Sequence, residues 1–288
     1  MSTVTGWFDT QRGLAVSLVS AGIGLAPVTM SPLAAQLISH YDWRHSMMIL
    51  AVIAAAIMAP ACLLLRRPPA LTQPSAQTAA VEDEQSTLTV KQAFLSAPFV
   101  ILFLTNFFCC ATHSGPIFHT VSYAVTCGIP LVTAVTIYSL EGIAGMPGRL
   151  VFGMAADKLG AKWVMVTGLL VQAIGALGYF FARDLAAFYA SAAVFGFIYS
   201  GVMPLYSVLV RENFSLKILG TLMGGLGLAG GLGMATGPVL GGWIFDTTGN
   251  YGWLYLSSFG IGLGAFLIAM LFKPFPKLLE PKPKPIAA

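Results

Sequence analysis

Eight long apolar stretches constrain the fold of this chain more than any other feature of its sequence. A bilayer core is crossed by about 20 apolar residues in a helix, and each stretch reaches that length. No alternating strand pattern is visible, and backbone groups in lipid must be satisfied within a helix or a closed barrel. We therefore predict an all-α polytopic membrane protein with about eight transmembrane helices, at 13–37, 46–65, 98–121, 130–153, 163–182, 185–209, 218–242 and 252–272.

The composition excludes several other classes of protein. Hydrophobic residues make up 57% of the 288 residues and charged residues only 9%, against roughly 25% charged in soluble domains. A water-soluble enzyme and a secreted disulfide scaffold are both excluded, and a net charge of +4 does not indicate a nucleic-acid partner. No nucleotide-binding loop, haem motif or catalytic-triad spacing is visible, so we expect no enzymatic activity, no cofactor and no metal site.

Basic residues are distributed unequally between the two sides of the predicted spans. With the N-terminus inside, only Arg44 and Arg183 lie in outer loops, whereas twelve basic residues lie inside. Cytoplasmic loops of membrane proteins are enriched in Lys and Arg, so we predict a multi-pass protein of the cell (inner) membrane with both termini cytoplasmic. The inner residues are Arg12, Arg66, Arg67, Lys91, Lys158, Lys162, Arg211, Lys217, Lys273, Lys277, Lys282 and Lys284.

Residues 68–96 form the one long connection. Three prolines and the acidic run Glu82-Asp83-Glu84 indicate a flexible cytoplasmic linker. The predicted division is 1–67, the last two helices of an N-terminal half; 68–96, the linker; 97–273, a complete six-helix C-terminal half; and 274–288, a cytoplasmic tail.

An internal repeat supports this division. Gly13-Leu14-Ala15 corresponds to Gly220-Thr221-Leu222, an offset of 207 (220 − 13), and Tyr41-Asp42-Trp43 corresponds to Tyr251-Gly252-Trp253, an offset of 210 (253 − 43). The alternative is that any two glycine-rich membrane helices look alike. If the repeat is real, it is a parallel repeat of six spans, and the first half is short of four helices.

Three motifs carry a resemblance to a known family. Residues 153–162, Gly-Met-Ala-Ala-Asp-Lys-Leu-Gly-Ala-Lys, resemble the loop signature G-x-x-x-D-[RK]-x-G-[RK]-[RK] of the major facilitator superfamily, with Ala161 in place of a basic residue. The segment from Gly233 through Gly237-Pro238 to Gly241-Gly242 resembles that superfamily's glycine-proline helix motif. Residues 7–15 are similar to the W-F-x-x-x-R-G-x-A start of helix five in the bacterial oxalate/formate and monocarboxylate transporter branches.

The resemblance implies helices five to twelve of such a transporter, truncated at its N-terminus. The implied function is secondary transport of a small organic anion, monocarboxylate-like, coupled to protons or to exchange. Two alternatives remain: an exporter of amphipathic compounds from the same superfamily, favoured by the glycine-proline motif, and a truncated membrane protein that does not transport. The expected partners are the anion, possible protons, the lipid bilayer, and a missing N-terminal segment or another subunit.

Two charged residues lie within one predicted span, where ionisable groups usually mark function. Glu141 could carry a proton, and Arg149 presents a fork suited to a carboxylate. By resemblance, Arg149 and Gly153 match the spacing of the substrate-binding arginine in the two branches. Two features of this sequence differ from those branches. No lysine lies in the span at 218–242, where oxalate carriers have one, and Gly145 stands where monocarboxylate carriers have an aspartate. The alternatives are a snorkelling Arg149 and a structural Glu141.

Further candidates for substrate binding are His113 and His119, six residues apart in the span at 98–121, and Tyr199 in the span at 185–209. Cavity lining and plain packing are both open for all three. Asp157, Lys158 and Lys162 are candidates for a conformational latch near a helix N-terminus, with ordinary loop charges as the alternative. Arg211 and Glu212 resemble a second latch or gate pair.

The short first half leads to one more expectation. In a parallel-repeat carrier the substrate path runs between the halves, so an incomplete first half should leave the cavity face of the second half against lipid. We expect Glu141, His113 and Arg149 to be exposed on that face, and the chain to be unable to transport alone.

Overall fold

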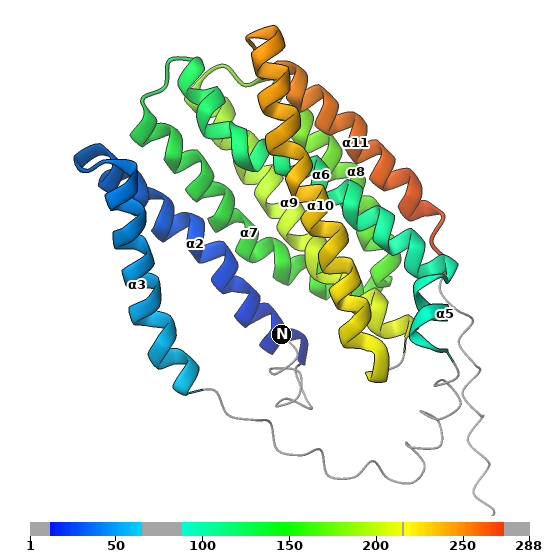
Figure 1. Ribbon diagram of the computed structural model, residues 1–288. Helices are drawn as coiled ribbons and strands as arrows, with labels where there is room; N and C mark the ends of the chain where they lie inside the picture. The colour runs from blue at the N-terminus through cyan, green and yellow to red at the C-terminus, as the bar shows by residue number, and fades with distance from the viewer. Residues whose placement is uncertain (1–11, 65–87, 215, 274–288) are drawn as a thin grey trace, which may run out of the picture.

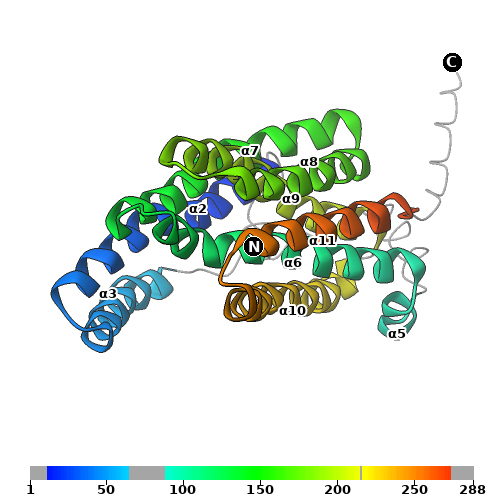
Figure 2. The same cartoon turned by 90° about the horizontal axis from the view of Figure 1, so that it is seen from above.

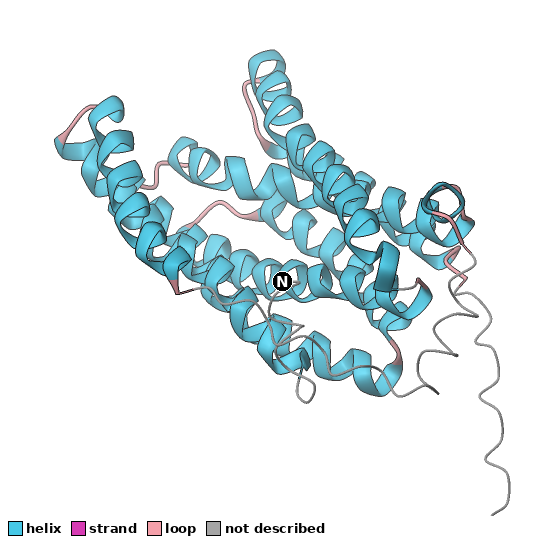
Figure 3. Cartoon of the chain, turned by 60° about the horizontal axis from the view of Figure 1, so that its bottom comes forward, coloured by secondary structure: helices cyan, strands magenta, loops and turns pink. Residues whose placement is uncertain are grey.

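The computed structural model describes residues 12–64, 88–214 and 216–273, and every regular element in these ranges is a helix (Figure 3). Eight of the helices are long and alternate in direction through one elongated bundle (Figure 1). The prediction of an all-α fold with about eight long helices is confirmed. The helices are α2 (Arg12–His40), α3 (Trp43–Leu63), α5 (Val90–Phe94), α6 (Ala97–Thr126), α7 (Leu131–Leu159), α8 (Ala161–Phe181), α9 (Leu185–Asn213), α10 (Leu216–Thr248) and α11 (Gly252–Met270).

Six of these helices combine the length and hydropathy of a membrane span: α3, α6, α8, α9, α10 and α11. The other two long helices, α2 and α7, have 29 residues each, about 44 Å at 1.5 Å per residue, which is enough to cross a bilayer. Helix α7 is less apolar because it carries Glu141 and Arg149 among its buried residues. The chain is a multi-pass membrane protein.

Several helices run further than the apolar pattern predicted. Helix α7 extends to Leu159 and α10 to Thr248, six residues beyond each predicted span, because a helix continues through polar residues until a terminating signal. For α7 that signal is Gly160, whose φ of +86° lies in the left-handed region that only glycine adopts without strain.

The described end of the predicted linker over 68–96 contains a short helix. Residues 65–87 lie outside the described ranges, but α5 occupies part of the remainder. The Thr89 hydroxyl accepts a hydrogen bond from the backbone N–H of Gln92, and the backbone N–H of Thr89 donates to the Gln92 side chain at 2.9 Å. This reciprocal pair is a capping box, and its T-x-x-Q spacing was readable in the sequence.

Helices α6 to α11 form a two-layer bundle, seen end-on in Figure 2 with α7, α8 and α9 on one side and α6, α10 and α11 on the other. The most extensive packing joins α7 to α9 and α6 to α10, while α11 lies against both α6 and α8. Helix α2 packs along α7, and α3 packs on α2 at the edge of the molecule. Ser46 is the one buried residue of α3 among those the structure describes.

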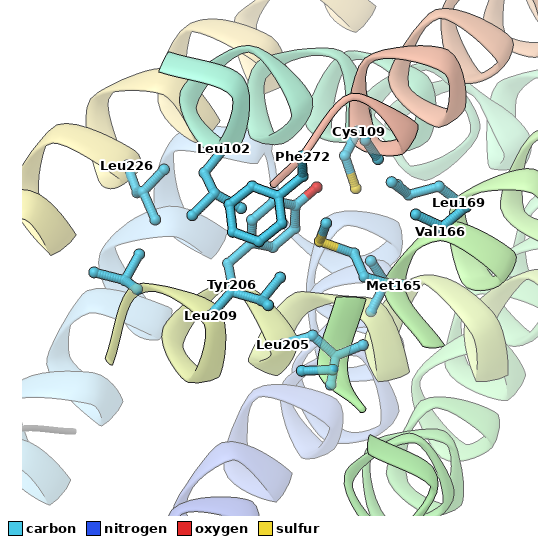
Figure 4. Packing of buried hydrophobic residues seen from close by; sticks show 14 of the residues in the cluster. Leu102, Cys109, Met165, Val166, Leu169, Leu205, Tyr206, Leu209, Leu226 and Phe272 are labelled. Carbon is cyan, nitrogen blue, oxygen red and sulfur yellow. The ribbon is translucent and has the colours of Figure 1, made fainter. Parts of the chain in front are cut away.

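The core contains two apolar clusters, one toward each end of the bundle. The first is built around side chains of α6, α8 and α9, among them Leu102, Met165 and Leu205 (Figure 4). The second is aromatic and includes Tyr123, Tyr179, Phe188 and Tyr255. Buried polar residues occupy the middle of several helices, including Thr112 and His113 of α6, Gln172 of α8 and Ser200 of α9.

Glycines permit the closest helix contacts in the bundle. A Cβ at Gly148 of α7 would overlap the backbone carbonyl oxygen of Phe197 on α9, and one at Gly237 of α10 would overlap Ser114 and Gly115 of α6. Small residues allow membrane helices to approach at backbone distance. The glycine-proline segment of α10 therefore serves packing against α6 at Gly237.

Candidate functional site

Helix α7 places Glu141 and Arg149 in the interior of the bundle. Glu141 is fully buried, and Arg149 is 7% exposed. They are eight residues apart, about 12 Å along the helix axis. Within the described ranges, Glu141 Oε1 and one terminal nitrogen of Arg149 have no hydrogen-bond partner. Buried polar atoms without partners are costly, so both side chains have unused capacity to bind.

The expectation that these residues face lipid is wrong. Glu141 and Arg149 are buried, with both α2 and α9 packed on α7, and His113 is only 3% exposed. The close contact between α7 and α9 explains this for Glu141: a Cβ at Gly196 of α9 would overlap the backbone oxygen of Glu141 and lie 2.8 Å from its Cγ. Because Gly196 has no side chain, α9 lies directly against the backbone and Cγ of Glu141.

Glu141 has one hydrogen-bond donor. The hydroxyl of Tyr179 on α8 donates to Glu141 Oε2 at 3.2 Å, and Tyr179 is itself completely buried. Tyr179 was not among the site residues predicted from the sequence. The available signal was a tyrosine deep in an apolar span, because a buried tyrosine hydroxyl normally finds a polar partner.

His113 is held by two neighbours from other helices. Its ring stacks on that of Tyr199 of α9, with centroids 5.1 Å apart, and its Nδ1 lies 3.4 Å from the side-chain nitrogen of Gln172 on α8. The same Gln172 nitrogen donates to the backbone oxygen of Cys109 at 3.2 Å. Gln172 was also missed by sequence reasoning, although an amide inside an apolar helix needs such partners.

Tyr199 brings the predicted residues together. Its ring is half-buried, contacts His113, and interacts electrostatically with both Glu141 and Arg149. Four of the predicted residues, from three helices, therefore surround one region inside the bundle. A guanidinium, a carboxyl group, an imidazole and a phenol together have the chemistry to bind a small organic acid.

Gly145 of α7 lies in the same region, one turn before Arg149. A Cβ at Gly145 would overlap the hydroxyl of Ser200 on α9. An aspartate at this position would therefore displace α9, which explains in physical terms why this chain has glycine there.

His119 does not belong to this group. It is half-buried, nearer the Thr126 end of α6, with its ring centroid 5.2 Å from that of Tyr251. On α10, a Cβ at Gly241 would overlap the His119 ring. His119 thus packs between α6 and α10, but its buried Nε2 has no hydrogen-bond partner among the described residues.

The predicted latch residues lie at the helix ends. Asp157 and Lys158 lie beyond the predicted span at 130–153, but α7 continues through them, and both are exposed in its last turn. Lys162 is in the first turn of α8, with its Nζ 4.9 Å from the Trp163 ring centroid. Arg211 and Glu212 are exposed at the end of α9. Over the described part of the chain, no ion pair joins any of these five residues.

Comparisons with known proteins agree with the arrangement of helices. The sequence model described as Major Facilitator Superfamily matches residues 1–160 and 147–288. Monocarboxylate transporter 13 of Bos taurus is 26% identical over 283 residues, with 93% of this chain and 61% of the relative covered. Monocarboxylate transporter 12 of Xenopus laevis is 24% identical over 279 residues, with 90% of this chain and 61% of the relative covered.

A solved structure shares the fold. The crystal structure of the human organic anion transporter MFSD10 superposes with a TM-score of 0.67 at 17% sequence identity, covering 93% of this chain and 66% of the other. The chain thus spans about 61% of the length of the two curated relatives described above.

Proposed function

The chain belongs to the Major Facilitator Superfamily, and on that premise we propose that it serves secondary transport of a small, monocarboxylate-like organic anion, coupled to protons or to exchange. Membership places it in a class of transporters rather than enzymes. The names of the two vertebrate relatives support a monocarboxylate as the substrate. The organic anion transporter MFSD10 supports only the shared fold.

The observation that carries this proposal is the burial of Arg149 with an unused guanidinium nitrogen. An arginine stays charged at any physiological pH, and an unpaired charge inside a membrane protein costs from about 2.5 kcal/mol upward. A carboxylate bound to the guanidinium fork would remove that cost. We assign Arg149 to the substrate carboxylate, with His113 and Tyr199 beside it, and keep His119 as a more distant lining residue.

Glu141 is assigned to the proton. It is the one acidic residue buried among the described residues, and its Oε1 has no partner there. A carboxyl group in such a position can take a proton and stay neutral, or release it when the environment changes. With Arg149 charged, ionised Glu141 balances the site when no substrate anion is present, and protonated Glu141 keeps it balanced when the anion is bound.

The organisation proposed with this function keeps the sequence-based division. Residues 1–67 correspond to the end of a first half and 97–273 to a second half, in a cell (inner) membrane with both termini cytoplasmic. Asp157, Lys158, Lys162, Arg211 and Glu212 are proposed to pair only in another state of the transport cycle. The length covered in the relatives leaves room for the companion segment such a cycle would use.

Equilibrium binding of radiolabelled lactate to the purified chain in nanodiscs tests the anion site. Arg149→Lys keeps the charge but loses the planar fork, so binding should weaken about tenfold or more. Arg44→Lys is the matched control, because Arg44 is exposed and lies over the ring of Trp43 at 4.4 Å. Lactate binding that is equal in both variants, or absent from the unmodified chain, contradicts the proposal.

A further inference from the structure

Tyr179 and Glu141 form a buried pair that joins α8 to α7. Both side chains are fully buried, and the Tyr179 hydroxyl donates to Glu141 Oε2 at 3.2 Å. The other oxygen, Oε1, has no partner in the described part of the chain. The two oxygens of the Glu141 carboxyl group therefore differ: Oε2 accepts a hydrogen bond and Oε1 does not.

The direction of the Tyr179 hydroxyl is fixed by ring packing. Its ring stacks on Tyr255 of α11 at a centroid distance of 5.4 Å and an interplanar angle of 23°, and it meets Phe195 of α9 edge-on at 5.7 Å. Aromatic contacts of this kind restrain a ring from two sides. The Tyr255 hydroxyl lies 3.3 Å from that of Thr120 instead, so Tyr179 alone serves the carboxyl group.

The helices packed on α7 bring few other ionisable groups near Glu141 in the described part of the chain. Helix α2 has none between Arg12 and His40. On α6, neither His113 nor His119 makes a hydrogen bond or ion pair with the carboxyl group within the described ranges. Phenols are the groups that interact with it electrostatically: Tyr138 of α7, Tyr179 of α8, Tyr199 of α9 and Tyr255 of α11.

We propose that Tyr179 is the positioning residue of the proton site: its hydroxyl holds Oε2 and makes Oε1 the atom that takes and releases the proton. This inference rests on the proposed role of Glu141. A donated hydrogen bond stabilises the ionised carboxyl group, so Tyr179 also sets the pH at which Glu141 is loaded. Protonation adds one proton to Oε1, and the Tyr179 O–H bond stays intact throughout.

Infrared difference spectroscopy of the purified chain in nanodiscs tests this without requiring transport. The protonated-carboxyl C=O band is followed against pH and assigned to Glu141 by its loss in Glu141→Gln. Tyr179→Phe keeps the ring and removes the hydroxyl, so the band should move to higher frequency and its midpoint should move up by about one pH unit, a tenfold change in proton affinity. Tyr206→Phe, at a buried tyrosine of α9 that is not among the phenols interacting with Glu141, is the matched control and should leave both the band frequency and its midpoint unchanged.

A second measurement covers the case in which Tyr179→Phe does not fold. In the unmodified chain with ring-labelled tyrosine, a tyrosine C–O band should change at the same pH as the Glu141 band, and Glu141→Gln should abolish that change. The inference is overturned if the Glu141 band titrates, Tyr179→Phe does not shift it, and the labelled tyrosine band does not change with pH. In that case the proposed proton role of Glu141 still stands. If no band is lost in Glu141→Gln, both are overturned.

Discussion

Gly196 of α9 lies against the backbone of Glu141, so that one helix covers the acidic residue of another without any side chain between them. The contact exists because α7 and α9 pack at backbone distance through glycines on both helices, including Gly148 on α7. This arrangement explains how the bundle keeps a carboxyl group away from lipid. Burial of the proposed site thus follows from the packing of neighbouring helices on α7, with α9 on Glu141 and α2 along the same helix.

The first prediction concerns this contact. Gly196→Ala should destabilise the bundle by about 1–3 kcal/mol, because the added methyl group overlaps the Glu141 carbonyl oxygen and overpacking has this cost. The measurement is the midpoint of thermal unfolding in detergent. Gly231→Ala on α10 is the control, since its Cβ would meet no atom within 4 Å. Equal midpoints for the two variants would show that α9 is not tightly packed on Glu141.

The second prediction concerns the contact between α6 and α10. Asn106 donates from its side-chain nitrogen to the backbone oxygen of Leu226 at 2.8 Å, and both residues are buried. Asn106→Leu keeps the size of the side chain and removes the bond, which should cost about 0.6–1.7 kcal/mol, the range found for hydrogen bonds between membrane helices. The free energy of unfolding in mixed detergent measures this.

Thr167→Val provides the comparison for Asn106→Leu. The Thr167 hydroxyl bonds only to carbonyl oxygens of its own helix, so its loss should have less effect than the loss of a bond between helices. A larger effect at Thr167 than at Asn106 would refute the claim that Asn106 joins α6 to α10.

The eight long helices could be predicted from the sequence because the length of an apolar run directly reports a membrane helix. The partners of the site residues could not. Tyr179 and Gln172 lie 38 and 59 residues from Glu141 and His113, the residues they contact, and hydropathy gives no information on which faces of two helices meet. The exposure of Glu141 was predicted wrongly for the same reason: the contact with Gly196 depends on packing between helices.

The third prediction is a pH effect at the start of α3. Asp42 accepts a hydrogen bond from the backbone N–H of His45 at 2.8 Å, and the same carboxylate oxygen lies 2.9 Å from Nδ1 of the His45 ring. The hydrogen bond from the His45 backbone is the main reason that the pKa of Asp42 is lowered from 3.8. The folded pKa is below the unfolded one, so the cap stabilises α3 above the unfolded pKa and loses this contribution as the pH falls through the folded value.

Hydrogen exchange of the first-turn amides of α3 measures this effect. Exchange at His45, corrected for its intrinsic pH dependence, should become less protected below the folded pKa of Asp42. Asp42→Asn retains a capping oxygen but cannot titrate, so its protection should be independent of pH over the same range. The same pH dependence in both proteins would mean that another group controls this turn.

The last prediction concerns orientation in the membrane. The C-terminal ends of α2, α6, α8 and α10 lie together on one side of the bundle (Figure 1). Among the basic loop residues named in the sequence analysis, only Arg44 and Arg183 are on this side. Arg183 is held there by the backbone oxygens of Phe180 and Ala182, each at 2.8 Å. Because basic loops stay in the cytoplasm, this side should face outward.

Tags placed after Trp43, within 122–129, at Asp184 and at Asn250 should react with an impermeant reagent in intact cells. Tags within 70–90 and at the C-terminus should react only after permeabilisation, and a reversed result at any pair of sites would break the proposed topology.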